Sequence, residues 1–146
     1  VTAERWAQYE LADWAKQPAG VTVARWSSDP ADRRQNAENA NQADVAVGFA
    51  DYLIAATGTI TVPTSPAQGR AFNYLPERYL AIVPQSGLVR STRQAVEKYE
   101  AAYQDGLASS ALNFISGPSN SGDIEMELVV GVHGPVECTY LVVSDR

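Results

Sequence analysis

The stretch ISGPSNSGDIEMELVVGVHGP, from Ile115 to Pro135, is the segment on which our prediction of the fold and of the binding site depends most. It begins where a short apolar run, residues 112–115, predicts the end of a buried strand. The small polar residues that follow include Ser116, Gly117, Ser119 and Ser121. A strand that passes through such backbone into a helix leaves N–H groups unpaired, and these groups suit an anion. The sequence therefore predicts an anion-binding strand–loop–helix, with simple capping of the helix by the serines and Asp123 as the plainer alternative.

Residues 123–130 fit two secondary structures. Apolar residues alternate at Ile124, Met126, Leu128 and Val130, which is the period of a strand. The pair Ile124 and Leu128 also fits one face of a helix, and Gly131 stands where a left-handed cap would end that helix. The serine- and glycine-rich approach and the Gly-Pro exit favour the helix, so we predict a helix over 123–130.

Composition limits the classes of protein to which the chain can belong. Its 146 residues fit one domain, and 45% hydrophobic with 19% charged residues is ordinary for a globular protein. A formal net charge of −6 argues against a general affinity for nucleic acid or for anionic lipid. A small basic pocket remains compatible with that charge.

Single copies of two residue types narrow the chemistry further. Cys138 is the only cysteine and His133 the only histidine, so the sequence offers neither the thiolates of an iron–sulfur cluster nor a multi-histidine metal site. We expect no metal and no cofactor. No apolar run is long enough to span a bilayer, and we expect a cytoplasmic protein. Because Val1 is not a methionine and helical pattern begins at once, we expect upstream residues to be absent.

Helical periodicity and strand-like runs alternate along the chain. Ala3, Ala7, Leu11 and Trp14 predict a helix over 2–16 that Pro18 and Gly20 end, and 21–26 alternates like a strand. Asp29 and Pro30 predict the start of a helix that reaches about Gln42, and Ser91 with Gln94 predicts a capped helix to about Gln104. Short apolar runs predict strands at 45–49, 52–55, 60–62, 80–84, 112–115 and 139–143. Strands that alternate with helices indicate an α/β sheet.

Few residues are of a type that carries chemistry. Asp123 and Glu125 stand two positions apart, so on a helix they would point to different sides and make a poor acid–base pair. Glu125 could still reach a ligand or a partner. His133 is a candidate general base or hydrogen-bond donor, and its alternative role is to bind the last carbonyls of the helix. Arg70, which follows Gln68 and Gly69, could bind a carboxylate or a phosphate, or could simply lie on the surface.

Two blocks of sequence go beyond generic pattern. ADYLIAATGTI, residues 50–60, and the ISGPSNSGDIE and GVHGP parts of 115–135 resemble the signature segments of the LUD domain, the family of lactate utilization protein C. The QGR at 68–70, the LP at 75–76 and the AIVP from Ala81 fall in the expected order, so the resemblance covers roughly residues 20–143.

The resemblance implies a fold, a process and partners. It implies a three-layer α/β/α open sheet similar to the NagB/RpiA/CoA-transferase-like superfold. It also implies a cytoplasmic role in oxidising L-lactate to pyruvate beside two iron–sulfur proteins. This chain would be the member of that set that carries no cluster. The family commonly has an acidic residue before TGT, where this chain has Ala56. Superfold relatives that transfer coenzyme A use a glutamate nucleophile at a similar turn, so acyl transfer through Ala56 is chemically unavailable.

Two functions remain open from the sequence. The first is an accessory subunit whose pocket holds a small anion or a partner segment. We expect that pocket to be built from Thr57, Gly58, Thr59, Arg70, Ser116, Gly117, Ser119, Ser121 and Asp123. The second is an independent enzyme or a metabolite-binding regulator that acts on a sugar phosphate, a nucleotide or an acyl-coenzyme A, with Glu125 or His133 as the catalytic base. Neither function includes binding to nucleic acid or to a membrane.

Overall fold

The computed structural model describes residues 2–14 and 19–144. The first helical elements are α1 (Thr2–Gln8), α2 (Leu11–Trp14), the 3-10 turn η1 (Pro30–Asp32) and α3 (Arg33–Gln42). The later ones are α4 (Arg70–Tyr74), the 3-10 turn η2 (Gln85–Gly87) and α5 (Thr92–Gln104). None of the helices described is both long and apolar enough to cross a bilayer.

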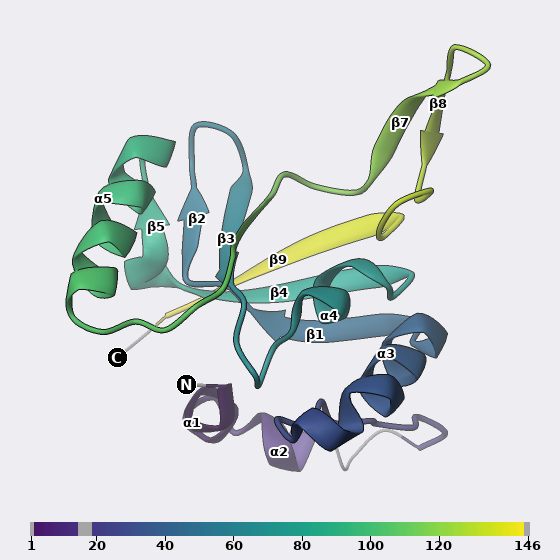
Figure 1. The fold of residues 1–146 in the computed structure, drawn as a ribbon, viewed down its shortest axis with the longest axis horizontal. Coiled ribbons are helices and arrows are strands. Elements are labelled where there is room, and N and C mark those ends of the chain that lie inside the picture. The colour runs from purple at the N-terminus through teal and green to yellow at the C-terminus, as the bar shows by residue number, and fades with distance from the viewer. Residues whose placement is uncertain (1, 15–18, 145–146) are drawn as a thin grey trace.

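The strands form two open sheets and a separate hairpin (Figure 1). The first sheet is parallel, in the order β1 (Val45–Phe49), β4 (Arg78–Pro84), β9 (Glu137–Val143). The second is mixed, in the order β5 (Leu88–Val89), β2 (Tyr52–Ile54), β3 (Thr59–Pro63), β6 (Leu112–Ile115). The strands β7 (Asn120–Ile124) and β8 (Glu127–Val130) pair with each other. The expected α/β class with open sheets is confirmed.

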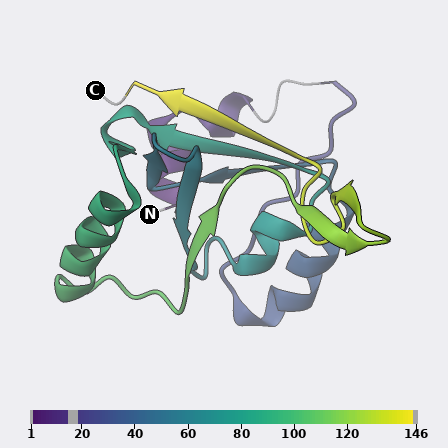
Figure 2. The same ribbon diagram turned by 90° about the horizontal axis from the view of Figure 1, so that it is seen from above.

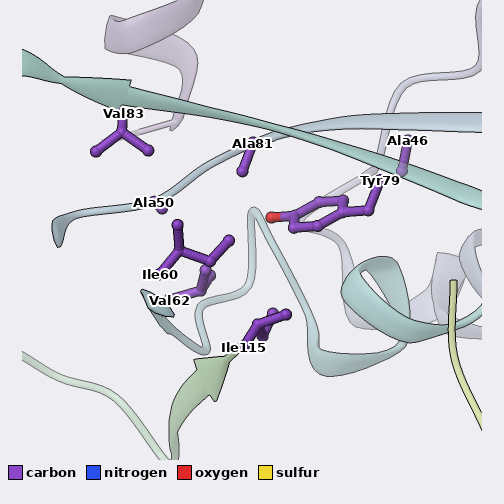
Figure 3. Close-up of a cluster of buried hydrophobic side chains, with 8 residues drawn as sticks. All are labelled: Ala46, Ala50, Ile60, Val62, Tyr79, Ala81, Val83 and Ile115. Atoms are coloured by element: carbon purple, nitrogen blue, oxygen red, sulfur yellow. The ribbon is translucent and has the colours of Figure 1, made fainter. Parts of the chain in front are cut away.

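The main core lies between the two sheets (Figure 3). Ala46, Ala50, Tyr79, Ala81 and Val83 face it from the first sheet and its end, and Ile60, Val62 and Ile115 face it from the second. All eight are at most 6% exposed, so each contributes most of its side chain to apolar burial. Short β-branched runs with tight connections therefore produced core strands, as their composition predicts.

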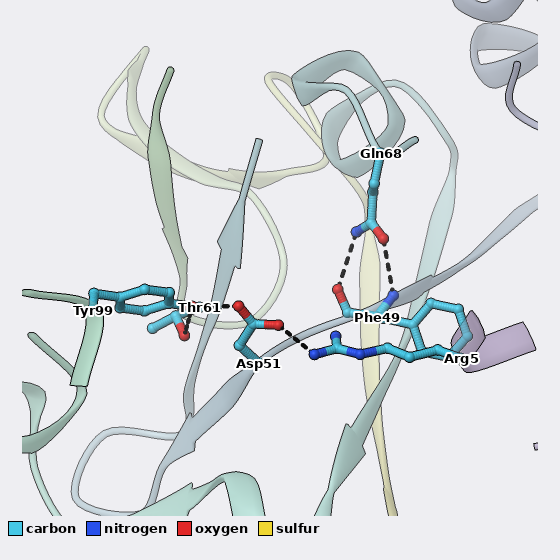
Figure 4. A network of polar contacts seen from close by, with 6 residues as sticks. All are labelled: Arg5, Phe49, Asp51, Thr61, Gln68 and Tyr99. Atoms are coloured by element: carbon cyan, nitrogen blue, oxygen red, sulfur yellow. Dashed lines mark hydrogen bonds and ion pairs between the residues drawn. The ribbon is translucent and has the colours of Figure 1, made fainter. Parts of the chain in front are cut away.

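A junction at Ala50 and Asp51 joins the sheets. The Ala50 N–H donates to the Ile82 carbonyl of the first sheet at 3.0 Å, and the next N–H, that of Asp51, donates to the Thr61 carbonyl of the second at 2.9 Å. The chain thus changes sheets between two consecutive residues. The side chain of Asp51 accepts from Arg5 of α1 at 2.8 Å and from the Tyr99 hydroxyl of α5 at 3.2 Å (Figure 4), so one carboxylate connects both flanking helices to the junction.

Gln68 completes the end of β1 from the side. Its side-chain oxygen accepts from the Phe49 N–H and its amide nitrogen donates to the Phe49 carbonyl, both at 3.1 Å (Figure 4). The amide thus imitates a neighbouring strand at a point where no strand pairs with Phe49 on that edge in the described part of the chain. The same nitrogen lies 3.1 Å from Asn73 Oδ1 and 3.2 Å from the Tyr79 hydroxyl. Gln68 is only 4% exposed, so these bonds are made away from water.

Tyr99 supports a prediction about alkaline stability. Its hydroxyl bonds the fully buried Thr61 hydroxyl at 2.8 Å, and burial, followed by the charge of Asp51, raises the pKa of the phenol above its ordinary value. We expect Tyr99→Phe to lower the free energy of unfolding at neutral pH by about 1–3 kcal/mol, because Thr61 loses this partner. Because the pKa is raised in the folded protein, the neutral phenol contributes its full stabilisation below about pH 10, and this contribution is lost as pH rises further. The difference in free energy of unfolding between the parent and Tyr99→Phe should therefore shrink above about pH 10. Urea unfolding of the parent and of Tyr99→Phe, at neutral pH and above about pH 10, measures the two differences in free energy of unfolding. A difference that is the same at both pH values would contradict the prediction.

Three predicted elements were wrong or need correction. The helix predicted over 123–130 is the hairpin β7–β8, because Glu125 (φ 53°) and Met126 (φ 61°) form a left-handed turn between two pairing strands. The alternating period was therefore the better guide. No strand forms over 21–26, where Val21 and Val23 are 59% and 45% exposed and have no sheet to pack on. The helix predicted over 2–16 divides at Glu10, whose φ is 53°, and Pro18 lies outside the described residues.

The remaining elements agree with their signals. Asp29 caps η1 by accepting from the Ala31 N–H at 2.9 Å, and Ser91 caps α5 by accepting from the Gln94 N–H at 3.4 Å. The Gln94 side chain reaches back to the Arg90 N–H at 2.8 Å, one residue earlier than a standard capping box requires.

Candidate functional site

A hollow of about 510 Å³ brings together two basic residues that are distant in the sequence. Its lining residues are Arg70, Ala71, Tyr74, Leu75 and His133. The first three belong to α4 and Leu75 follows it directly, whereas His133 lies in the segment after β8. Arg70 and His133 were predicted separately as an anion ligand and as a possible base, and the fold places both at one hollow.

The QGR sequence explains how Arg70 is presented. Gln68 is fixed by its bonds to Phe49, and Gly69 lies under Trp26, where an added Cβ would be 2.6 Å from the indole ring. The indole N–H donates to the Pro66 carbonyl at 3.1 Å, so Trp26 itself is held in place. Arg70 follows as the first residue of α4, is exposed, and carries its guanidinium 5.7 Å from the centre of the Tyr74 ring. Two anchored residues, Gln68 and Gly69, therefore precede an exposed guanidinium.

Ser119 holds the segment that carries His133. The Ser119 hydroxyl accepts from the His133 N–H at 3.2 Å, and its carbonyl accepts from the Gly131 N–H at 2.9 Å. Its own N–H donates to the Pro135 carbonyl at 2.9 Å. At Gly134 an added Cβ would be 3.2 Å from Ser119 Cβ and 3.9 Å from the Tyr74 ring, so a glycine allows this loop to approach α4 closely. The serine acts on the site through backbone position.

Tyr74 provides the aromatic wall of the hollow. Its hydroxyl is 3.5 Å from Asn113 Oδ1, and the Asn113 amide donates in turn to the Val62 carbonyl at 2.8 Å and to Thr64 Oγ1 at 3.0 Å. Burial raises the pKa of the Tyr74 phenol, and the Arg70 guanidinium opposes that rise in part. The phenol is therefore neutral at physiological pH, and the ring presents a face on which a guanidinium and a planar ligand can stack.

The lining is suited to a small organic anion. It contains a guanidinium and an imidazole, and none of its members is a carboxylate. A guanidinium offers parallel N–H donors that match a carboxylate or a phosphate, and an imidazole can donate to or accept from a neighbouring oxygen. Within the described ranges no group of three histidine, cysteine, aspartate or glutamate residues could hold a metal ion.

A second predicted set meets elsewhere, as a ladder of hydroxyls. Thr57 Oγ1 lies 2.7 Å from Thr59 Oγ1, which lies 2.7 Å from the Ser116 Oγ. Gly58, with φ at +63°, makes the turn between β2 and β3 that brings the two threonines together, and Ala56 belongs to the same turn. The ladder carries no formal charge, so it is a polar contact surface and a weaker anion ligand than the hollow.

The expectation of bare amides after β6 is corrected by the structure. The Gly117 N–H donates to the Tyr140 hydroxyl at 2.8 Å, and the Ser119 N–H donates to Pro135. Because β9 and the segment after β8 both return beside this loop, they supply acceptors that the local sequence does not reveal. Ser121 lies in β7, as does the backbone of Asp123, whose side chain is outside the described residues. Glu125 is exposed at the tip of the hairpin and does not line the hollow.

Cys138 gives a test of how this loop is closed. Its thiol donates to the Gly117 carbonyl at 3.3 Å, and burial, followed by the charge of Glu137, raises the pKa of the thiol. A raised pKa leaves less thiolate, so we expect reaction with an aromatic disulfide reagent at pH 8 to be about tenfold or more slower in the folded protein than in urea. Equal rates in the folded and the urea-unfolded protein would show that the Cys138 thiol is not held against the Gly117 carbonyl.

Tyr74, Ala71 and Leu75 are the lining residues that sequence reasoning missed. The sequence did contain a signal for Tyr74, because it stands four positions after Arg70, and this spacing places two side chains on one face of a helix. The five-residue helix α4 was not predicted, and without it that spacing had no meaning.

The protein is an α/β domain with open sheets, and the hollow lies where α4 meets the segment after β8. The sequence pattern of the LUD domain matches residues 2–143, and the chain belongs to the LUD domain family. It is 45% identical to lactate utilization protein C of Geobacillus kaustophilus, with 97% of this chain and 60% of the relative covered. It is 42% identical to the protein of that name from Bacillus subtilis, with 92% and 55% covered. The chain thus spans about 60% or less of these relatives' length.

A solved structure agrees at the level of the fold. The crystal structure of a DUF162 family protein from Deinococcus radiodurans superposes with a TM-score of 0.53 at 19% identity, covering 96% of this chain and 83% of the other. At that identity the likeness supports the α/β arrangement alone.

Proposed function

We propose that the chain is part of an accessory subunit, without an iron–sulfur cluster of its own, in the cytoplasmic oxidation of L-lactate to pyruvate. Its relatives carry the name lactate utilization protein C. In this proposal, separate iron–sulfur proteins would perform the electron transfer. The sequence has one cysteine, too few to ligate a cluster. The observation that carries the proposal is the pairing of Arg70 and His133 at one hollow of a chain whose net charge is −6.

The ligand of the hollow would be a small 2-hydroxy or 2-oxo acid. The Arg70 guanidinium would take the carboxylate through two parallel N–H donors, and the His133 ring would meet the oxygen on the neighbouring carbon. Ala71, Tyr74 and Leu75 supply apolar surface for a methyl group. A three-carbon acid fills only part of about 510 Å³, which leaves space for solvent or for a side chain from a partner.

The hydroxyl ladder would complete the accessory role. Thr57 and Ser116 are exposed at the end of the second sheet, with the buried Thr59 hydroxyl bonded between them, and their two hydroxyls would bond a polar backbone segment of a partner. With alanine at residue 56, this turn would bind and would not transfer an acyl group.

Recovery of the tagged chain from native cells tests the accessory role. From cells grown on L-lactate, we expect the eluate to contain an iron–sulfur protein, recognised by its iron and sulfide content and its visible absorption. The matched control is the same tag on a variant in which the ladder is removed, Thr57→Ala with Ser116→Ala, and we expect it to recover less iron. A chain that elutes alone from lactate-grown cells would overturn the accessory role.

A further inference from the structure

The hairpin of residues 120–130, which we call the arm, extends away from both sheets. Figure 1 shows it projecting from the body, and Figures 1 and 2 together place it at the opposite end of the molecule from α5. Its register shifts between Ser121 and Ile124, where two residues of β7 face one residue of β8. A single two-stranded hairpin is marginally stable by itself in water, so an arm of this kind gains from being covered.

The turn of the arm displays an apolar side chain. Glu125 and Met126 both have left-handed backbone, at φ 53° and 61°, a conformation that costs about 1–2 kcal/mol for each residue with a Cβ. Met126 is 96% exposed at the tip. A methionine in this position is flexible and polarisable, which suits contact with an apolar surface of another molecule.

The apolar surface continues along one face of β8. Leu128 is 73% exposed and Val130 is 46% exposed, and alternate residues of a strand share a face, so both lie on the same side. Val132 and Val136, at 41% and 40%, extend apolar exposure to the foot of the arm. Contiguous exposure of this kind marks an interaction surface, whereas scattered single residues do not.

The charged side chains described on the arm itself are both carboxylates. Glu125 and Glu127 are exposed on the arm, and the sequence contains no lysine or arginine between Lys98 and Arg146. At the foot, Arg78 is already engaged by Glu77 at 2.8 Å and by Glu137 at 3.5 Å. The arm therefore offers apolar side chains between carboxylates, and a complementary surface is apolar with a basic rim.

A second copy of the chain does not provide that surface. Two arms that met would bring Glu125 and Glu127 of both copies together, and each copy carries a net charge of −6. Like charges at an interface suppress association. A protein of opposite surface charge fits the arm better.

We propose that the arm docks into an apolar groove, rimmed by lysine and arginine, on a partner protein. Met126, Leu128 and Val130 enter the groove, and Glu125 and Glu127 pair with its rim. The inference rests on the accessory role proposed above for the existence of a partner, but it does not depend on anion binding in the hollow.

Fluorescence anisotropy with two designed peptides tests the arm directly. The probe is a labelled amphipathic helix of leucine and lysine, which presents an apolar stripe with a basic rim, and the comparison peptide replaces every lysine with glutamate. We expect the lysine peptide to bind and its affinity to fall as salt is added. Met126→Ser with Leu128→Ser should weaken it about tenfold, since two apolar side chains leave the contact. Val21→Ser with Val96→Ser also removes two exposed apolar side chains, at 59% and 46%, but at positions distant in sequence, and it should change the affinity less than twofold.

Charge reversal separates docking from loss of folding. Glu125→Lys with Glu127→Lys should transfer preference to the glutamate peptide, a gain that an unfolded chain would not show. Glu100→Lys with Asp105→Lys changes net charge equally away from the arm and should leave the preference with the lysine peptide. The inference is overturned if the arm variants bind as the parent does, if the distant variants act equally, or if sedimentation shows self-association that Met126→Ser with Leu128→Ser abolishes.

Discussion

Replacing Gln68 with leucine is expected to lower the free energy of unfolding by about 2–4 kcal/mol. The substitution leaves the N–H and the carbonyl of Phe49 without the partners that now lie at 3.1 Å. Each buried backbone group left unpaired costs about 1–3 kcal/mol, and the apolar surface that leucine adds offsets part of the loss. The effect is large because Gln68 is 4% exposed and water cannot take its place.

Urea unfolding followed by circular dichroism measures the change. We expect the midpoint of Gln68→Leu to fall with the slope unchanged, because the same surface is exposed on unfolding. Gln104→Leu, at the exposed end of α5, is the matched control and should stay within about 0.5 kcal/mol of the parent. Parent-like stability of Gln68→Leu would show that the amide does not hold the end of β1.

Replacing Arg70 with glutamine is expected to weaken binding of pyruvate and L-lactate about tenfold or more. Hydrogen bonds to charged groups contribute about 1.5–3 kcal/mol, and glutamine offers neither the charge nor the planar pair of donors. Arg70→Lys keeps the charge but not the fork, so an intermediate affinity is expected. The fold should tolerate both changes, because Arg70 is exposed and its guanidinium contacts the ring of Tyr74, which lies on the same short helix.

Calorimetric titration of each variant with each acid measures the effect. Arg25→Gln removes the same charge at another exposed position and should bind as the parent does. If Arg25→Gln weakens binding as much as Arg70→Gln, the acids respond to net charge and the hollow is not a site.

Local signals were sufficient for most of the framework. Ser91 and Gln94 began α5 as a capping pair should. The apolar runs that predicted β3 and β6 formed strands because each buries β-branched side chains between the sheets, and β1 buries Ala46 in the same core. The segment 123–130 failed for a physical reason. Its glycine and serine neighbours are compatible with a helix end and with a hairpin base alike, and only pairing across Glu125 and Met126 decides between them.

The site depended on contacts that no local pattern contains. Arg70 and His133 were each recognisable by residue type, but they stand 63 positions apart, and their meeting depends on Ser119 holding the loop after β8. The amides of Gly117 and Ser119 were expected to be free and are paired, because Tyr140 and Pro135 return from later in the chain. The proposed anion site therefore consists of the Arg70 and His133 side chains beside the loop, and not of the loop's backbone.

His133 gives the most direct measurement of the central claim, because it is the only histidine in the sequence and its ring protons form one recognisable pair of NMR signals. We predict that pyruvate or L-lactate shifts these signals in a saturable manner in the parent protein and in Arg25→Gln, and that Arg70→Gln loses the saturation. Signals that stay in place while either acid is raised to millimolar concentration would show that no carboxylate is held between Arg70 and His133, and would contradict the account.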